Sequence, residues 1–185
     1  MGLFDKVKQE NAVPAAQPQS GNRTVAVQFA KLPDTLAEFQ ALPQAQLSTP
    51  FDTAAMAVLA LCFYPDNAQL SLEMLDVLKG PKPLSAYDKQ FIRDRLTGKD
   101  YVPRSYFEGA SPKNNYLPSE PYTIKVSENP YSYQEQGYAK LYLQSGGADS
   151  PRPIQLRLAK DGKWYLWEQF LLADIRQPES ADPWA

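Results

Sequence analysis

One stretch of the chain gathers residue types that could bind an anion. Residues 145–153 read SGGADSPRP, so the amides of two adjacent glycines and the cation of Arg152 could form a small anion-binding nest. The stretch lacks the lysine and the helix start that a phosphate-binding loop requires. The same residues are typical of a reversal between antiparallel strands, in which Gly146 and Gly147 would supply positive φ angles. We expect this stretch mainly to turn the chain.

The chain contains no histidine and one cysteine. These counts exclude Ser-His and Cys-His nucleophile pairs, histidine-ligated zinc or iron, a cysteine-rich metal site and an intramolecular disulfide. Cys62 lies in the apolar run ALALCFYP, which predicts a small core residue and not a nucleophile. Hydrolysis by two carboxylates needs no histidine, but no spacing brings two acids together. We expect no catalytic residue, no metal site and no cofactor.

A second candidate site is the face of the predicted sheet that points away from the core. Its aromatic and cationic residues are Lys125, Lys140, Tyr142, Arg157, Tyr165 and Trp167. Such a face can stack bases or sugar rings, or bind a protein partner. The aromatic segment 101–118 could instead cover it, and the sequence leaves the three alternatives open. The net charge of −2 argues against nucleic acid.

A third candidate lies where the segments RDR and DYVPR follow each other. Arg93 and Arg95 would point about 200° apart on a helix, so they do not form one basic patch. Local ion pairs on a solvated surface are the simpler interpretation. The alternative is recognition of an acidic ligand by the arginines of these segments, including Arg104, together with Tyr101 and Tyr106.

These candidate sites depend on elements with clear signals. Three or four helices are predicted in the segments 33–42, 48–64, 66–81 and 84–99. Apolar residues surround the second of them, so we expect it to be the central, buried helix. In the last one we expect Tyr87, Phe91 and Leu96 to form the buried side. The segment 101–118 is rich in proline and aromatic residues and is predicted to be an ordered loop.

Alternating apolar residues predict strands in the segments 24–29, 122–127 and 139–144, and a hairpin over 154–169. A three-residue hairpin loop with Gly162 left-handed would pair Leu156 with Leu166 and Leu158 with Trp164. That register places the aliphatic side chains on one face, so we prefer it to a two-residue loop. The order of elements predicts an α+β domain with an N-terminal helical half packed on a C-terminal antiparallel sheet. By analogy, the sheet could form a cone as in NTF2-like or cystatin-like folds.

The composition predicts one domain and a tail. Residues 1–22 are rich in Pro, Gln, Ala and Ser and are expected to be a flexible segment before a single domain at 23–185. The apolar fraction of 43% is enough for a core. No run approaches the roughly 18 apolar residues of a membrane span, and no secretory signal is apparent, so we expect a cytoplasmic protein without membrane insertion.

Two long strings carry a family resemblance. The strings YVPRSYFEGASPKNNYLPSEPYTIKVSENPYSY and GYAKLYLQSGGADSPRPIQLRLAKDGKWYLWE resemble an uncharacterised bacterial family, a domain of unknown function. The likeness runs from about Val25 to the closing DIRQPESADPWA. It implies a bacterial source and brings no known activity or functional residues.

Two function classes follow from these observations. The first is a non-enzymatic binding or scaffold protein that acts through protein–protein contacts. The second is a small-molecule-binding domain or an enzyme with a pocket between the sheet and the loop 101–118. The residues expected to meet a partner or ligand are Tyr142, Arg157, Tyr165, Trp167, Arg104 and Tyr106.

Overall fold

The computed structural model describes residues 21–185, so nearly all of the expected flexible segment 1–22 lies outside the described residues. The helices are α1 (Leu36–Ala41), α2 (Pro50–Cys62), α3 (Ala68–Lys79), α4 (Ala86–Leu96) and α5 (Tyr101–Arg104). The strands are β1 (Arg23–Phe29), β2 (Tyr122–Glu128), β3 (Tyr138–Leu143), β4 (Arg152–Leu158) and β5 (Trp164–Gln169). Within this range the helices precede four of the strands, which confirms the predicted α+β class.

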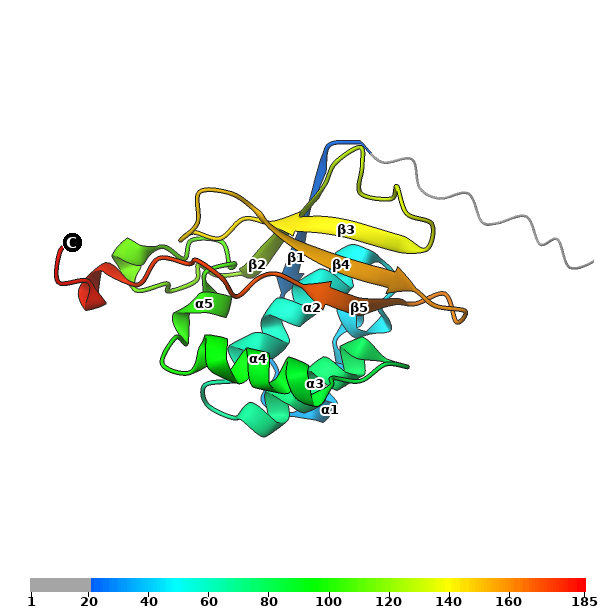
Figure 1. Cartoon of the computed structure of the whole chain (residues 1–185), viewed down its shortest axis with the longest axis horizontal. Coiled ribbons are helices and arrows are strands. Elements are labelled where there is room, and N and C mark those ends of the chain that lie inside the picture. Colours follow the sequence, from blue (N-terminus) through cyan, green and yellow to red (C-terminus); the bar gives the residue numbers. More distant parts are fainter. Residues whose placement is uncertain (1–20) are drawn as a thin grey trace, which may run out of the picture.

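The sheet and the helices form two layers (Figure 1). The strands pair in the order β1-β2-β3-β4-β5, each antiparallel to the next. Helix α2 contacts all five strands, and α3 packs against the side of α2. The sheet therefore has an inner face on α2 and an outer face that points away from the helices.

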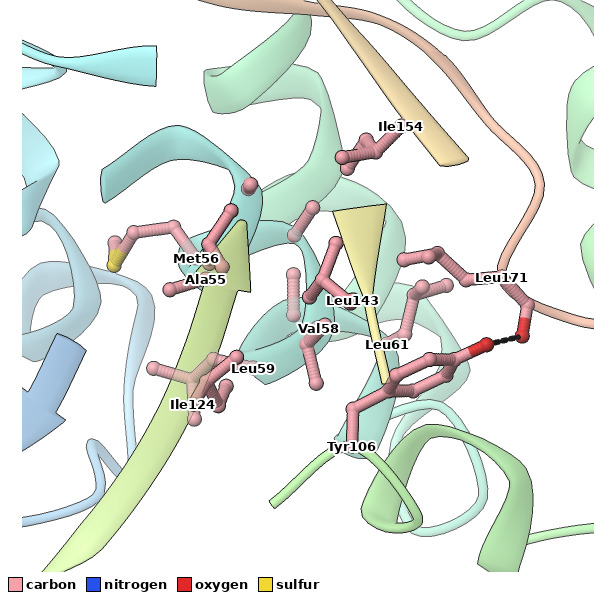
Figure 2. Close-up of a cluster of buried hydrophobic side chains, with 14 of the residues drawn as sticks. Ala55, Met56, Val58, Leu59, Leu61, Tyr106, Ile124, Leu143, Ile154 and Leu171 are labelled. Atoms are coloured by element: carbon pink, nitrogen blue, oxygen red, sulfur yellow. Dashed lines mark hydrogen bonds between the residues drawn. The ribbon is translucent and has the colours of Figure 1, made fainter. Parts of the chain in front are cut away.

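Helix α2 is the centre of the core, as its apolar sequence predicts. Thr49 caps it by accepting a hydrogen bond from the Asp52 amide at 3.2 Å, and Pro50 occupies the first turn, where a missing N–H costs nothing. Of its 13 residues, 11 are buried. Figure 2 shows Val58 and Leu59 of α2 among side chains from the strands, including Leu143. Burial on nearly every side explains why apolar residues surround this helix.

Helix α4 begins where expected but buries a different face. Ser85 and Asp88 form a capping box at its start. The buried residues are Ile92 and Leu96, four positions apart, whereas Tyr87 is 77% exposed. The expectation that Tyr87 lies on the buried side is wrong. Tyr87 and Ile92 are five positions apart, which places their side chains about 140° apart around the helix.

The β4–β5 hairpin has the predicted register. Leu156 pairs with Leu166, Leu158 pairs with Trp164, and Gly162 has a φ of +80°. The register shifts between Gln155 and Leu156, because Gln155 pairs with Glu168. Nothing in the sequence pattern predicted this β-bulge, which leaves Trp167 as the extra residue of β5.

The segment 101–118 is ordered, as predicted, and lies at one end of the sheet. Phe107 forms an isolated bridge with Ile124 of β2, and the Tyr106 hydroxyl donates to the Leu171 carbonyl at 2.5 Å (Figure 2). Tyr106, Phe107 and Tyr116 are all buried. The loop reaches the outer face only at β2, where Glu108 pairs with Lys125 at 2.8 Å, and it leaves Arg157 of β4 exposed.

Cys62 should react slowly with thiol reagents in the native protein. It packs against the hydrophobic core at the end of α2, and burial raises the pKa of its thiol to about 12. The thiolate is the reactive form, so native labelling at pH 7.5 should be slower than that of an unfolded control by about tenfold or more. Mass spectrometry after iodoacetamide treatment, with and without urea, measures this ratio. Equal rates in the two conditions would show that Cys62 is accessible and ionised.

Candidate functional site

The outer face carries an arginine held between aromatic rings at the β4–β5 hairpin. The Arg157 guanidinium carbon lies 4.6 Å from the centroid of the Trp167 ring and 5.3 Å from that of Tyr138. The two rings meet edge to face, with centroids 5.7 Å apart. The Lys82 ammonium lies 4.5 Å from the Trp167 centroid. Two cations therefore share one indole ring, an arrangement stabilised by the ring quadrupole.

Strand pairing and the bulge assemble this cluster. Arg157 stands opposite Tyr138 on β3 and opposite Tyr165 on β5, so aromatic residues flank it on both neighbouring strands. Directly opposite side chains on one face of an antiparallel sheet lie close together. The bulge adds Trp167 to this group although Trp167 has no paired residue in β4. A β-bulge increases the local twist of a strand and changes the direction of its side chains, here that of Trp167.

The end of α3 closes the cluster from the side. The Lys79 ammonium donates to the Trp167 carbonyl at 2.9 Å, and burial lowers the pKa of this amine. Gly80 has a φ of +57°, and a Cβ at this position would overlap the ring of Tyr165. A glycine here lets α3 end directly against β5. The contact brings Lys82 to a strand that follows more than 80 residues later.

A hollow of about 560 Å³ lies beside the cluster, and we name it the β5 cleft. Its lining residues are Lys79, Pro81, Lys82, Arg157, Leu158, Ala159, Lys160, Asp161, Tyr165, Leu166 and Trp167. Four of them are cationic and one is acidic, although the whole chain has a net charge of −2. The local charge is therefore opposite in sign to that of the protein.

The single acid of the β5 cleft is already committed to local hydrogen bonds. The Asp161 carboxylate accepts from the Tyr165 hydroxyl at 2.6 Å and from the Lys163 amide at 3.0 Å. The hydrogen bond from Tyr165 is the main cause that lowers the pKa of Asp161. These bonds hold the Asp161 carboxylate in the hairpin, so it does not neutralise Arg157.

Arg157 differs from other arginines in how its donors are used. Arg152 donates to the carbonyls of Ser150, Ala173 and Asp174, and Arg176 pairs with Asp149 at 2.8 Å. Within residues 21–185, the Arg157 guanidinium has ring contacts but no hydrogen-bond acceptor and no carboxylate partner. Its N–H donors face solvent and can bind an anion.

The structure brings together three of the predicted site residues. Arg157, Tyr165 and Trp167 all line the β5 cleft. Tyr142 is on the same face but pairs with Ser127 and Pro153, away from the lining residues. Arg104 and Tyr106 lie in the segment 101–118, where Arg104 pairs with Asp100 at 2.9 Å and Tyr106 is buried. They do not form one site with Arg157.

Four residues of the site were not predicted from the sequence, namely Tyr138, Lys79, Lys82 and Lys160. The alternation that places Lys140 and Tyr142 on the outer face also places Tyr138 there, so this residue had a detectable signal. The lysines had none, because isolated surface lysines are ordinary and their place depends on how α3 meets β5.

The stretch 145–153 turns the chain, as expected, but for a different reason. Neither Gly146 nor Gly147 has a positive φ, so that expectation is wrong. A Cβ on Gly146 would overlap the Ala110 carbonyl oxygen, and a Cβ on Gly147 would overlap the Tyr116 hydroxyl. Close approach of neighbouring segments therefore requires these glycines. Arg152 binds backbone carbonyls, so its donors are not available for an anion nest.

Two kinds of feature are absent from the described residues 21–185. In this range no three His, Cys, Asp or Glu side chains gather closely enough to hold a metal ion. None of the helices in the same range has the length and apolar character needed to cross a membrane.

Comparison with known proteins places the chain in a family. A family model described as a domain of unknown function (DUF6935) matches residues 31–179. The chain belongs to this family. The predicted resemblance to an uncharacterised domain family is therefore confirmed, while the bacterial source stays a prediction. All residues that line the β5 cleft fall within the matched range of DUF6935.

Neither the curated proteins nor the solved structures gave a match to the chain. The likeness to NTF2-like or cystatin-like folds stays an analogy, and the function must be argued from the site.

Proposed function

We propose that this DUF6935 protein is a binding domain and that the β5 cleft binds a small anionic ligand. The observation that carries the proposal is Arg157, which is held by two rings while its N–H donors stay unpaired within the described residues. Lys79, Lys82 and Lys160 surround the same hollow. Four cationic side chains and one acidic side chain, Asp161, line this hollow, so its local charge favours an anion.

The contacts of Arg157 favour recognition of a carboxylate or phosphate. Stacking against Tyr138 and Trp167 restricts the guanidinium without using any of its donors. A restricted guanidinium loses less entropy when it forms two parallel hydrogen bonds to a planar or tetrahedral anion. The site is thus pre-organised for an oxyanion.

Stacking of a nucleic-acid base is less well supported. The Trp167 ring already faces two cations, Arg157 and Lys82, so its surface is occupied. Sequence-tolerant binding of single strands relies on free aromatic platforms along an extended cationic groove. A cluster confined to one hairpin and the end of one helix fits a small ligand better.

Protein binding through the outer face remains a second candidate function. It is favoured by the aromatic and cationic residues of that face, among which Arg157 is exposed and Tyr142 and Tyr165 are half-buried. We propose no reaction for the site. A pocket between the sheet and the loop 101–118 stays an alternative prediction, and Tyr106, Phe107 and Tyr116 of this loop are buried.

Replacement of Arg157 by Gln should weaken binding of inorganic phosphate and methyl phosphate by about tenfold or more. This factor corresponds to the loss of charge-assisted hydrogen bonds. Titration followed by NMR of the tryptophan indole N–H signals measures the affinity, because Trp167 touches the site. Binding should also weaken as the salt concentration rises.

A matched control for Arg157→Gln is Arg176→Gln. Arg176 is also partly exposed, but it pairs with Asp149 and is not among the residues lining the cleft. It should leave phosphate binding unchanged. Equal losses in the two variants, or saturable binding that survives Arg157→Gln intact, would contradict the proposal.

A further inference from the structure

A second hollow of about 210 Å³ lies between α4 and β5, and we name it the α4–β5 groove. Its floor is formed by the buried side chains of Leu61, Leu75, Ile92 and Leu166. Phe91 and Phe170 are also among its lining residues, and Phe170 is 49% exposed. The groove thus offers apolar surface that an apolar ligand group could remove from water.

The α4–β5 groove and the β5 cleft meet along β5. Lys79, Leu166 and Trp167 line both hollows. The ammonium of Lys79 lies where the hollows meet, because it donates to the Trp167 carbonyl at 2.9 Å. One ligand can therefore touch an apolar surface and a cationic surface that lie next to each other.

We infer that the ligand is a monomeric amphiphilic anion, whose charged group occupies the β5 cleft and whose short alkyl or acyl chain occupies the α4–β5 groove. This inference rests on the proposed function, because it assigns the charged group to Arg157 and the neighbouring lysines. It adds the apolar part of the ligand and its direction along β5.

The charges around the α4–β5 groove determine which way the ligand lies. The groove is lined by one cation, Lys79, and by two carboxylates, Asp88 and Glu168, so it attracts an anion less than the β5 cleft does. Asp88 is fixed there, because it accepts from the amide and the hydroxyl of Ser85, both at 2.8 Å. The cationic β5 cleft is then the favoured place for the head group, and the chain extends toward α4.

A series of alkyl phosphates tests the inference on the full-length protein. Methyl, butyl, hexyl and octyl phosphate are titrated below their micellar concentrations, with calorimetry or indole NMR as the readout. Each added methylene should tighten binding by about three- to fourfold until the groove is filled, as expected for burial of alkyl groups. The inference is overturned, while the proposed function stands, if methyl phosphate binds and octyl phosphate binds no more tightly.

Two variants separate the parts of the ligand. Phe170→Ser should weaken octyl phosphate by at least fivefold and leave methyl phosphate unchanged, whereas Arg157→Gln should weaken both. Tyr87→Ser, at a more exposed position of the same groove, repeats the test if Phe170→Ser does not fold. Leu117→Ser is the matched control, since Leu117 is 70% exposed but outside both hollows. Loss of octyl phosphate binding in Leu117→Ser equal to that in Phe170→Ser would overturn the inference.

Two further outcomes would contradict binding of a monomeric amphiphile. If no phosphate ester binds, the proposed function itself fails. Phosphatidylcholine vesicles containing phosphatidic acid provide the membrane alternative. Co-sedimentation with these vesicles, without binding of monomeric octyl phosphate, would overturn the inference in favour of a lipid surface.

Discussion

Leu156→Ala is expected to lower the free energy of unfolding by about 2–5 kcal/mol, the range for a leucine lost from a packed core. Leu156 is fully buried on the inner face of β4, where it pairs with Leu166. Truncation removes apolar contacts and leaves a cavity between the sheet and α2 that the surrounding elements can fill in part. Urea or guanidinium melts followed by circular dichroism measure the change.

The neighbouring residue provides the control for Leu156→Ala. Arg157 follows Leu156 in the same strand but is exposed on the outer face. Arg157→Ala should change the free energy of unfolding by about 1 kcal/mol or less, the usual scale for exposed cation–π contacts. A mild Leu156→Ala variant together with a severe Arg157→Ala variant would mean that the two faces of β4 are assigned the wrong way round.

Gly146→Ala is expected to destabilise the fold by about 1–3 kcal/mol or more, as for overpacking of a close contact. The new methyl group would overlap the Ala110 carbonyl oxygen, which belongs to the backbone and cannot rotate away. The Gly146 amide also donates to the Ser105 carbonyl at 2.8 Å, so the two segments are held together. Thermal melts compared with the unmodified protein measure the loss.

Two companion variants identify the cause of the Gly146 effect. Gly21→Ala should leave the thermal stability nearly unchanged, because no heavy atom lies near a Cβ at Gly21 and the φ of Gly21 is not positive. Gly146→Asn should lower the stability of the fold more than Gly146→Ala does, since the side chain of asparagine is larger. If asparagine were tolerated better than alanine, the requirement would be a left-handed backbone, which asparagine tolerates, and close approach would be refuted.

Local signals in the sequence predicted much of the fold. Thr35, Thr49 and Ser85 each cap a helix within the predicted segments, and a cap depends on a side chain and an amide only three residues away. The hairpin register followed from the requirement that Leu156 and Leu166 share one face. The central position of α2 followed from its apolar residues on all sides.

The sequence-based predictions were wrong or incomplete where the local structure depends on contacts with segments far away in the sequence. Tyr87 is exposed because α4 packs with Ile92 and Leu96 against the body. The contacts with other elements determine this orientation of the helix. Gly146 permits the close approach of Ala110, which lies 36 residues earlier, and no local pattern reveals such an approach. The bulge at Trp167 breaks the strict alternation on which strand predictions depend.

Some residues of the candidate site could also be predicted from local sequence patterns, whereas others depend on tertiary contacts. Alternation along the strands was enough to place Arg157 and Tyr165 on the outer face, because side chains of a strand point to alternate sides. The approach of Lys79 and Lys82 to Trp167 depends on where α3 ends against β5. That contact joins residues separated by more than 80 positions, and it results from burial of the α3 and β5 side chains in a common core. The amino-acid sequence alone thus determined one side of the cleft, and only the tertiary structure decided that lysines from a helix end complete it.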